Sequence, residues 1–147
     1  MITIIAGVLG ATVRILVLEL ISRVRVAHVD PVKAVGTLYH GYLGHPLMRG
    51  IGAHYLFGII SAFIYLALIS FVSPSASIPV TAAFGALIGL HHGYAEGFSL
   101  VPSVAEHHPL PEYREYGHEV VIYNWLVQIL YGLTVGAIFG WAKVQLF

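Results

Sequence analysis

The sequence predicts an all-α integral membrane protein: a four-helix transmembrane bundle with up-down-up-down topology and interfacial loop and cap segments on one face. Three observations support this fold class. Of the 147 residues, 58% are hydrophobic and 10% are charged, and the mean hydropathy is +0.83, as is typical of membrane proteins. Four apolar segments are long enough to cross a bilayer. All nine histidines fall on the same side of the bundle that these segments would form.

The four apolar segments define the predicted spans. A helix rises about 1.5 Å per residue, so about 20 residues reach across the hydrocarbon core of a bilayer. Consecutive spans run in opposite directions, and we expect the chain to form one membrane domain. The predicted spans cover residues 3–24, 50–72, 79–100 and 120–139.

Two longer connections lie on the side of the bundle that carries the histidines. The loop 25–49 contains turn signals such as Asp30-Pro31, and we expect a short interfacial helix within it. The segment 101–117 contains three prolines, which regular helix does not accommodate in its interior. We therefore expect it to fold as a cap over this side; its prolines are Pro102, Pro109 and Pro111.

Glycines recur every fourth residue in the third and fourth spans. Small residues at this spacing form a groove in which another backbone can approach closely. Two interpretations stay open: the groove packs against a neighbouring helix, or a flat cofactor or a lipid chain lies against it. The glycines are Gly85, Gly89, Gly93 and Gly97 in the third span and Gly132, Gly136 and Gly140 in the fourth.

The distribution of basic residues predicts the orientation. Loops on the histidine side carry most of the Lys and Arg, whereas the opposite side carries only Lys143. The positive-inside rule then places the histidines in the cytoplasm, and we expect a protein of the inner, cytoplasmic membrane. The basic residues on the histidine side are Arg23, Arg25, Lys33, Arg49 and Arg114.

Charged residues also occur within the first span. Arg14 lies near its middle, where a charge is costly unless it faces the bundle interior and finds a partner. Glu19 and Arg23 are four residues apart in the favourable order and are expected to pair with each other. Arg14 then needs another acceptor, either Glu96 or backbone carbonyls near Gly93.

Histidines and acidic residues at similar depth suggest a metal centre. His92 and Glu96 are one turn apart and point the same way, whereas His91 points about 100° away. The chain has no cysteine, so imidazole and carboxylate are its strong ligands, and we expect a transition metal (Fe, Cu or Zn) or haem b. The alternative is that these histidines hydrogen-bond to neighbouring helices. The candidate ligands are His54, His91, His92, Glu96, His118 and Glu119.

A second group of polar residues follows one face of the fourth span. Side-chain amides in lipid must find partners, so this face is expected to look into the bundle. It either forms hydrogen bonds between helices or lines a water-filled path from the histidine side. The residues are Asn124, Gln128 and Tyr131.

The functional expectation is a polytopic membrane protein whose one-sided His/Glu cluster binds a metal or haem, as a subunit of a membrane redox complex. One alternative is a non-enzymatic protein that responds to acid, because histidines change charge between about pH 5 and 8. A second is a structural accessory subunit. A third is a di-iron oxygenase, although neither His91-His92 nor His107-His108 is preceded by the further histidine of a histidine box. Enzymatic activity is left open.

The expected partners are membrane lipid and either other membrane subunits or further copies of this chain. A formal net charge of +0 and the lack of a Lys/Arg run argue against binding to nucleic acid.

The region 52–125 resembles the YagU-like family of small bacterial and archaeal inner-membrane proteins, which is associated with acid tolerance. The resemblance implies a four-helix membrane fold in which three histidines belong to a shared pattern; it implies no enzyme activity or ligand. The matching residues are His54, Phe57, Tyr65, Gly85-Ala86-Leu87, His91, Pro102, Pro109 and Gly117-His118.

Overall fold

The computed structural model describes residues 1–24, 30–38, 44–72, 77–115 and 117–146. Throughout these ranges every regular element is a helix. The elements are α1 (Ile2–Arg23), α2 (Pro31–Thr37), α3 (Pro46–Val72), α4 (Ile78–Ala95), the π-helix η1 (Glu96–Leu100), α5 (Val101–Glu106), the 3₁₀-helix η2 (Pro111–Tyr113) and α6 (His118–Leu146).

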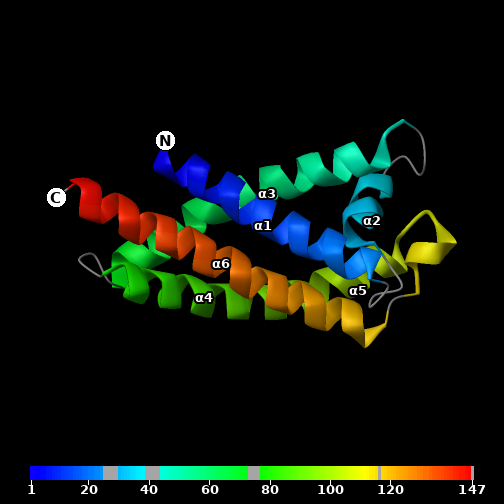
Figure 1. Cartoon of the computed structure of the whole chain (residues 1–147). Helices are drawn as coiled ribbons and strands as arrows, with labels where there is room; N and C mark the ends of the chain where they lie inside the picture. Colours follow the sequence, from blue (N-terminus) through cyan, green and yellow to red (C-terminus); the bar gives the residue numbers. More distant parts are fainter. Residues whose placement is uncertain (25–29, 39–43, 73–76, 116, 147) are drawn as a thin grey trace.

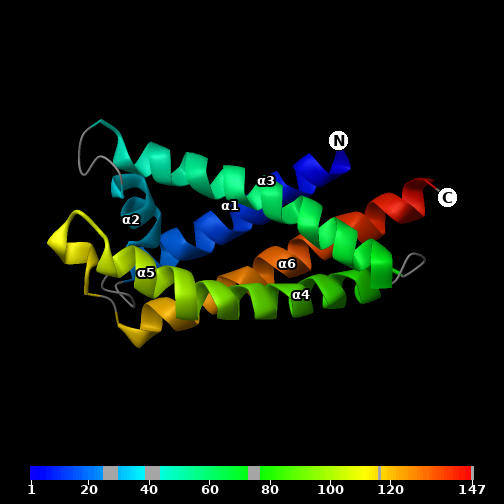
Figure 2. The same ribbon diagram turned by 180° about the vertical axis from the view of Figure 1, so that it is seen from behind.

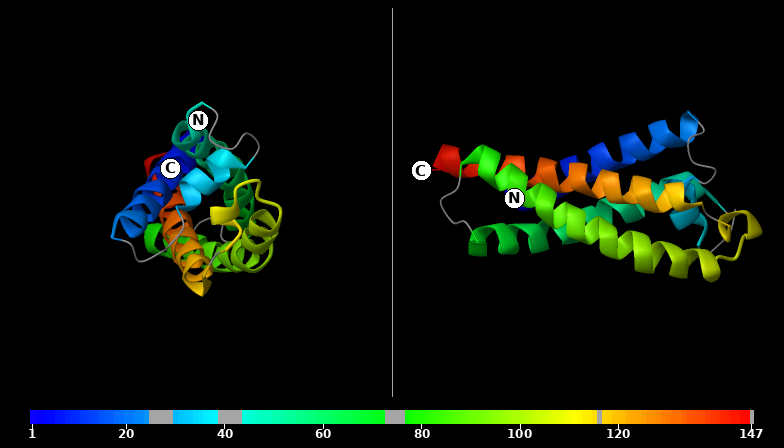
Figure 3. Two further views of the ribbon diagram at one scale, coloured as in Figure 1. Left: turned by 90° about the vertical axis from the view of Figure 1, so that its right-hand side faces the viewer. Right: turned by 90° about the horizontal axis from the view of Figure 1, so that it is seen from below.

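Four long helices, α1, α3, α4 and α6, lie lengthwise beside one another (Figures 1 and 2). Both termini lie at one end of the molecule, and α2 and α5 lie at the other (Figure 1). Helix α6 packs against α4 along most of its length and also contacts α1, while α1 packs against α3. Figure 3 shows the same elongated arrangement from below, and its end-on view shows the helices grouped around one long axis.

Three helices in the described ranges are long and apolar enough to cross a membrane: α1, α3 and His118–Lys143 of α6. Their outward faces expose large apolar side chains such as Leu16, Phe57 and Phe63, which suits contact with lipid tails. Helix α4, which carries two histidines near its end, is not among the three. That residues 79–100, the third predicted span, cross the membrane therefore stays a prediction.

The core of the bundle lies where α3 and α6 meet. The rings of Tyr65 and Tyr131 contact each other edge to face, with centroids 5.4 Å apart. Both residues are almost fully buried, as are Ile69, Val135 and Phe139 in the same cluster.

The glycines of α4 face α6 rather than a ligand. A Cβ at Gly85 would lie 2.1 Å from the carbonyl oxygen of Gly132, and one at Gly136 would lie 2.2 Å from that of Thr81. These distances are too short for any side chain, so the backbones are in direct contact. Of the two interpretations of the glycine spacing, helix packing accounts for these positions.

Helix continues through Pro102, contrary to the expectation that the prolines would exclude regular helix from the cap. Directly before this proline the chain forms η1, in which the Val101 N–H bonds to the Glu96 carbonyl. A proline in a helix clashes with the carbonyl four residues earlier. The wider π-turn relieves this clash, and α5 follows in the same direction. Pro109 and Pro111 do lie outside α-helix.

The short helix expected in the loop 25–49 is α2. Asp30 caps it, because its Oδ1 accepts hydrogen bonds from the Val32 and Lys33 N–H groups at 3.0 Å each. The helix packs closely on the start of α3, where a Cβ at Gly36 would lie 1.8 Å from the Pro46 carbonyl oxygen. Residues 25–29 and 39–43 of the loop, with His28 and His40 among them, lie outside the described residues.

Candidate functional site

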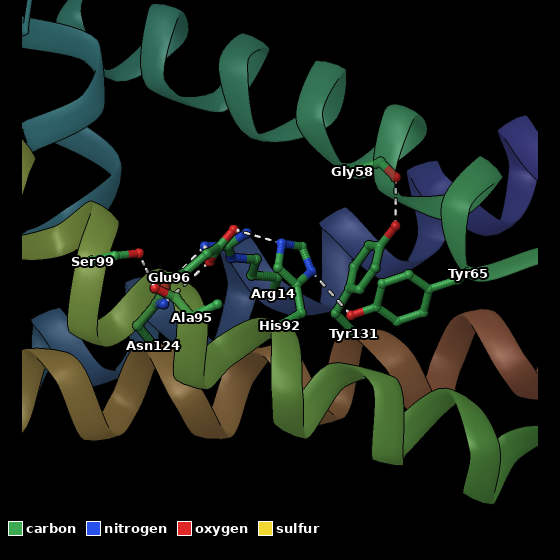
Figure 4. A network of polar contacts seen from close by, with 9 residues as sticks. All are labelled: Arg14, Gly58, Tyr65, His92, Ala95, Glu96, Ser99, Asn124 and Tyr131. Atoms are coloured by element: carbon green, nitrogen blue, oxygen red, sulfur yellow. Dashed lines mark hydrogen bonds and ion pairs between the residues drawn. The ribbon is translucent and has the colours of Figure 1, made fainter. Parts of the chain in front are cut away.

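Three helices meet at the Glu96 carboxylate, at the junction of α4 and η1. Its Oε2 accepts hydrogen bonds from Arg14 Nη2 of α1 at 3.0 Å and from Asn124 Nδ2 of α6 at 3.2 Å. Arg14 Nη2 also donates to Asn124 Oδ1 at 2.9 Å, which closes a triangle (Figure 4). The side chains of Arg14 and Glu96 are only 14% and 17% exposed. A buried cation and its counter-ion thus join elements from three parts of the chain.

His92 extends this network into α3. Its Nε2 lies 3.2 Å from Glu96 Oε1, and its Nδ1 lies 3.1 Å from the Tyr65 hydroxyl. A carboxylate can only accept, so Nε2 carries the hydrogen. In the neutral ring Nδ1 is then an acceptor and the Tyr65 hydroxyl donates to it. Beside this pair, the Tyr131 hydroxyl donates a hydrogen bond to the Gly58 carbonyl oxygen (Figure 4).

A cavity of about 110 Å³ lies next to this network, at the end of the bundle that carries α2 and α5. Its wall is mostly apolar, and residues of α1, α2, α3, η1, α5, η2 and α6 contribute to it. The polar residues that line it are Arg14, His54, Glu96, His108, Tyr113 and Asn124.

His54 and Arg14 each bring an unpartnered nitrogen to this cavity. His54 is buried, and its Nδ1 lies 2.9 Å from the Gly50 carbonyl oxygen one turn earlier. The carbonyl can only accept, so Nδ1 carries the hydrogen and Nε2 of the neutral ring is an acceptor. Among the described residues nothing donates to that Nε2. Both hydrogen bonds of Arg14 are made by Nη2, and its buried Nε has no hydrogen-bond partner among the described residues.

His108, also on the cavity wall, connects α2 to the segment that follows α5. The ring is fully buried, with 0% exposure. Its Nε2 lies 3.0 Å from the Ala34 carbonyl oxygen and 3.3 Å from the Thr37 hydroxyl, while its Nδ1 accepts the Leu110 N–H at 3.1 Å. Both ring nitrogens are therefore used, one as donor and one as acceptor.

The six predicted metal ligands do not gather at one place. His92 and Glu96 contact each other, and His54 lies on the cavity wall. His91 is exposed and bonds through Nδ1 to the Leu87 carbonyl of its own helix. His118 is exposed, and Glu119 lies against Gly117. Over the ranges that the structure describes, no group of three or more His, Asp or Glu side chains has the arrangement to hold a metal.

The other predicted polar residues divide into buried and exposed groups. Asn124, Gln128 and Tyr131 are all buried in the bundle. Asn124 joins the Glu96 network, whereas neither amide atom of Gln128 has a hydrogen-bond partner among the described residues. Glu19 and Arg23 pair at 2.9 Å on the surface, away from the Arg14 network.

Two residues of this site were not predicted from the sequence. Tyr65 is an ordinary aromatic in an apolar span, and nothing in its spacing indicates a histidine partner. His108 follows an exposed histidine directly, and only the tertiary structure distinguishes it from His107, which bonds to the Ser103 carbonyl of its own helix.

No family model, curated protein or solved structure matches this chain. The resemblance to the YagU-like family therefore stays a prediction.

Proposed function

We propose that this chain is an acid-responsive, non-enzymatic protein of the cytoplasmic membrane, a four-helix transmembrane bundle whose cap loosens when His108 takes up a proton. In this proposal α4 also spans the membrane, beside α1, α3 and α6, and α2, α5 and η2 lie on the cytoplasmic face. The basic residues Lys33, Arg49 and Arg114 on that face support the orientation through the positive-inside rule.

The observation that supports the proposal most directly is that one ring nitrogen of His108 donates a hydrogen bond and the other accepts one. Its Nε2 faces carbonyl and hydroxyl oxygens of α2, and its Nδ1 accepts the Leu110 N–H. A proton on Nδ1 turns this acceptor into a donor that faces another donor. The Leu110 bond is then lost, and a cation is left in a site with no exposure to water.

The described charged groups at the cavity and on α2 are already paired and do not compensate for such a proton. Arg114 Nε donates to the His108 carbonyl oxygen at 2.7 Å, and the Tyr113 ring lies 4.8 Å from the imidazole. Across the cavity are Arg14, His54 and Glu96, and the Glu96 carboxylate is already shared by Arg14, Asn124 and His92. On α2, Lys33 and Asp30 pair with each other at 3.1 Å.

Protonation thus weakens the contact between α2 and the cap, which together form one wall of the cavity. Because His108, Ala34 and Tyr113 all line the cavity, their separation opens it towards the cytoplasm. Acid acts as the signal, and the opened cap is the response.

Hydrogen–deuterium exchange of the full chain in lipid nanodiscs tests this mechanism. We expect faster exchange in residues 31–37 and 105–113 at pH 5.5 than at pH 7.5, after correction for the intrinsic pH dependence of exchange. In His108→Gln, which cannot titrate, the corrected difference should disappear. His107→Gln is the matched control, because His107 is exposed and on the same turn; it should keep the difference. Equal pH dependence in wild type and His108→Gln would refute the mechanism.

A transition metal or haem centre stays a second candidate on one observation, the contact between His92 and Glu96 at 3.2 Å. These two residues would supply an imidazole and a carboxylate ligand.

A further inference from the structure

The cavity beside Arg14 contains both halves of a hydrogen-bonding site, a donor and an acceptor that no described protein group uses. We propose that it binds a short-chain monocarboxylic acid in its protonated, uncharged form. The inference concerns what occupies the cavity, and it does not require that His108 acts as the acid switch.

The donor is the part of the Arg14 guanidinium that makes no hydrogen bond in the protein: its buried Nε has no partner among the described residues. Nη2 of the same guanidinium makes both of its hydrogen bonds, to Glu96 and Asn124. Arg14 lines the cavity, and its side chain is 14% exposed. A largely buried N–H group without an acceptor is costly, so a ligand carbonyl oxygen placed here gains a charge-assisted hydrogen bond.

The acceptor is His54 Nε2. The hydrogen bond from Nδ1 to the Gly50 carbonyl holds the ring in the tautomer that leaves Nε2 without a hydrogen. This nitrogen accepts from an O–H group. A protonated carboxyl group offers a carbonyl acceptor and a hydroxyl donor on one carbon, which matches the two protein groups.

The charge of the site selects the uncharged form of the acid. Glu96, 3.0 Å from Arg14, already neutralises the guanidinium, so a carboxylate would add a second negative charge beside Glu96. The other titratable groups on the wall do not offset it: both nitrogens of His108 are bonded, and Tyr113 carries no positive charge. His92 lies on the other side of Glu96 and bonds to its Oε1. A carboxylate therefore enters only with a proton.

The size and the wall of the cavity limit the rest of the ligand. An engineered apolar cavity of roughly 150 Å³ binds benzene, so the 110 Å³ here suits a molecule of about six heavy atoms or fewer. Leu100, Val101, Val104 and Val120 line it and provide an apolar surface for a short alkyl chain. Acetic to butyric acids have this size and polarity.

Binding of ¹³C-labelled butyrate to the full chain in nanodiscs, followed by NMR between pH 5.5 and 7.5, tests the proposal, with empty nanodiscs as the background. We expect the apparent affinity for total butyrate to fall about tenfold for each pH unit, because the protonated fraction falls by that factor above the pKa of the acid. Butan-1-ol, which lacks the carbonyl acceptor, should compete at least tenfold less well than butyric acid at pH 5.5.

Two variants locate the site. His54→Phe keeps a ring of similar size but removes the acceptor, and we expect at least a tenfold loss of affinity. His91→Phe is the matched control, since His91 has the same Nδ1 bond to its own helix but is exposed; its affinity should stay unchanged. Val104→Trp, which fills the cavity without altering a polar group, should abolish binding.

Several outcomes would overturn the proposal: an affinity that does not change with pH, equal competition by butan-1-ol, or undiminished binding in both His54→Phe and Val104→Trp. Binding by His108→Gln separates this proposal from the acid switch. Unchanged pH-dependent binding in that variant supports the ligand site even where the exchange experiment shows no switch.

Discussion

Arg14 Nη2 and Glu96 Oε2 lie 3.0 Å apart although 82 residues separate them in the chain. The guanidinium comes from the middle of α1 and the carboxylate from the first residue of η1. This ion pair, with Asn124 as the third member, links α1 to η1 and α6 inside an apolar bundle. We therefore expect the stability of the bundle to depend on this pair.

Glu96→Gln should destabilise the protein strongly, because it leaves the Arg14 cation largely buried without its counter-ion. Loss of one partner of a buried pair costs about 3–5 kcal/mol in the free energy of unfolding. Reversible unfolding in mixed micelles measures it. Glu19→Gln is the matched control: it also removes a carboxylate from an Arg, but Arg23 is 75% exposed, and the change should stay below about 1 kcal/mol. Similar losses in the two variants would show that the Arg14 pair has no special role.

Gly85→Ala should disturb the contact between α4 and α6. The new methyl group would lie 2.1 Å from the Gly132 carbonyl oxygen, so the helices must separate, at a cost of about 1–3 kcal/mol. Thermal unfolding in detergent measures the effect. At Gly52 a Cβ meets no atom within 4 Å, and Gly52→Ala should be neutral or stabilising by about 0.5–1 kcal/mol. A tolerated Gly85→Ala would contradict the direct backbone contact.

The tautomer of His92 is a prediction for nitrogen NMR. We expect the neutral ring to carry its hydrogen on Nε2, facing Glu96, while Nδ1 accepts from Tyr65. Tyr65→Phe keeps the edge-to-face packing on Tyr131 but removes the hydroxyl, and should cost about 1 kcal/mol and shift the Nδ1 resonance. Tyr94→Phe, at a residue that is 55% exposed, should change neither the free energy of unfolding nor the His92 Nδ1 resonance. A ring protonated on Nδ1 in the wild type would rule out the proposed hydrogen-bond directions.

The metal or haem expectation makes a separate prediction about His92. If His92 and Glu96 are ligands, protein purified without a histidine tag contains metal or a haem absorption band, and His92→Ala lowers it sharply. The neighbouring His91→Ala should leave the content unchanged, because that ring is exposed and bonded to its own helix. Elemental analysis and an absorption spectrum decide the matter. Equal metal or haem content in the two variants would show that His92 is not a ligand.

The sequence by itself determined the elements whose cause is local. The apolar segment 3–24 becomes α1 (Ile2–Arg23), because twenty apolar residues form a helix wherever lipid surrounds them. It also limited the acceptors of Arg14 to two, since few groups in the spans can accept from a cation. The predicted second span begins at Gly50, whereas α3 begins at Pro46; proline favours the first turn of a helix, so the helix starts at Pro46 and includes Arg49 before the apolar segment.

Tertiary structure decided which polar groups meet and which atoms they use. Glycine spacing is the same for a helix partner and for a ligand, and only the backbone of α6 against α4 distinguishes them. His107 and His108 are adjacent and identical in type, yet one is exposed and the other joins α2 to the cap. The direction of each imidazole hydrogen bond depends on acceptors up to 74 residues away. Such contacts depend on the packing of distant segments, which the local pattern of residues does not contain.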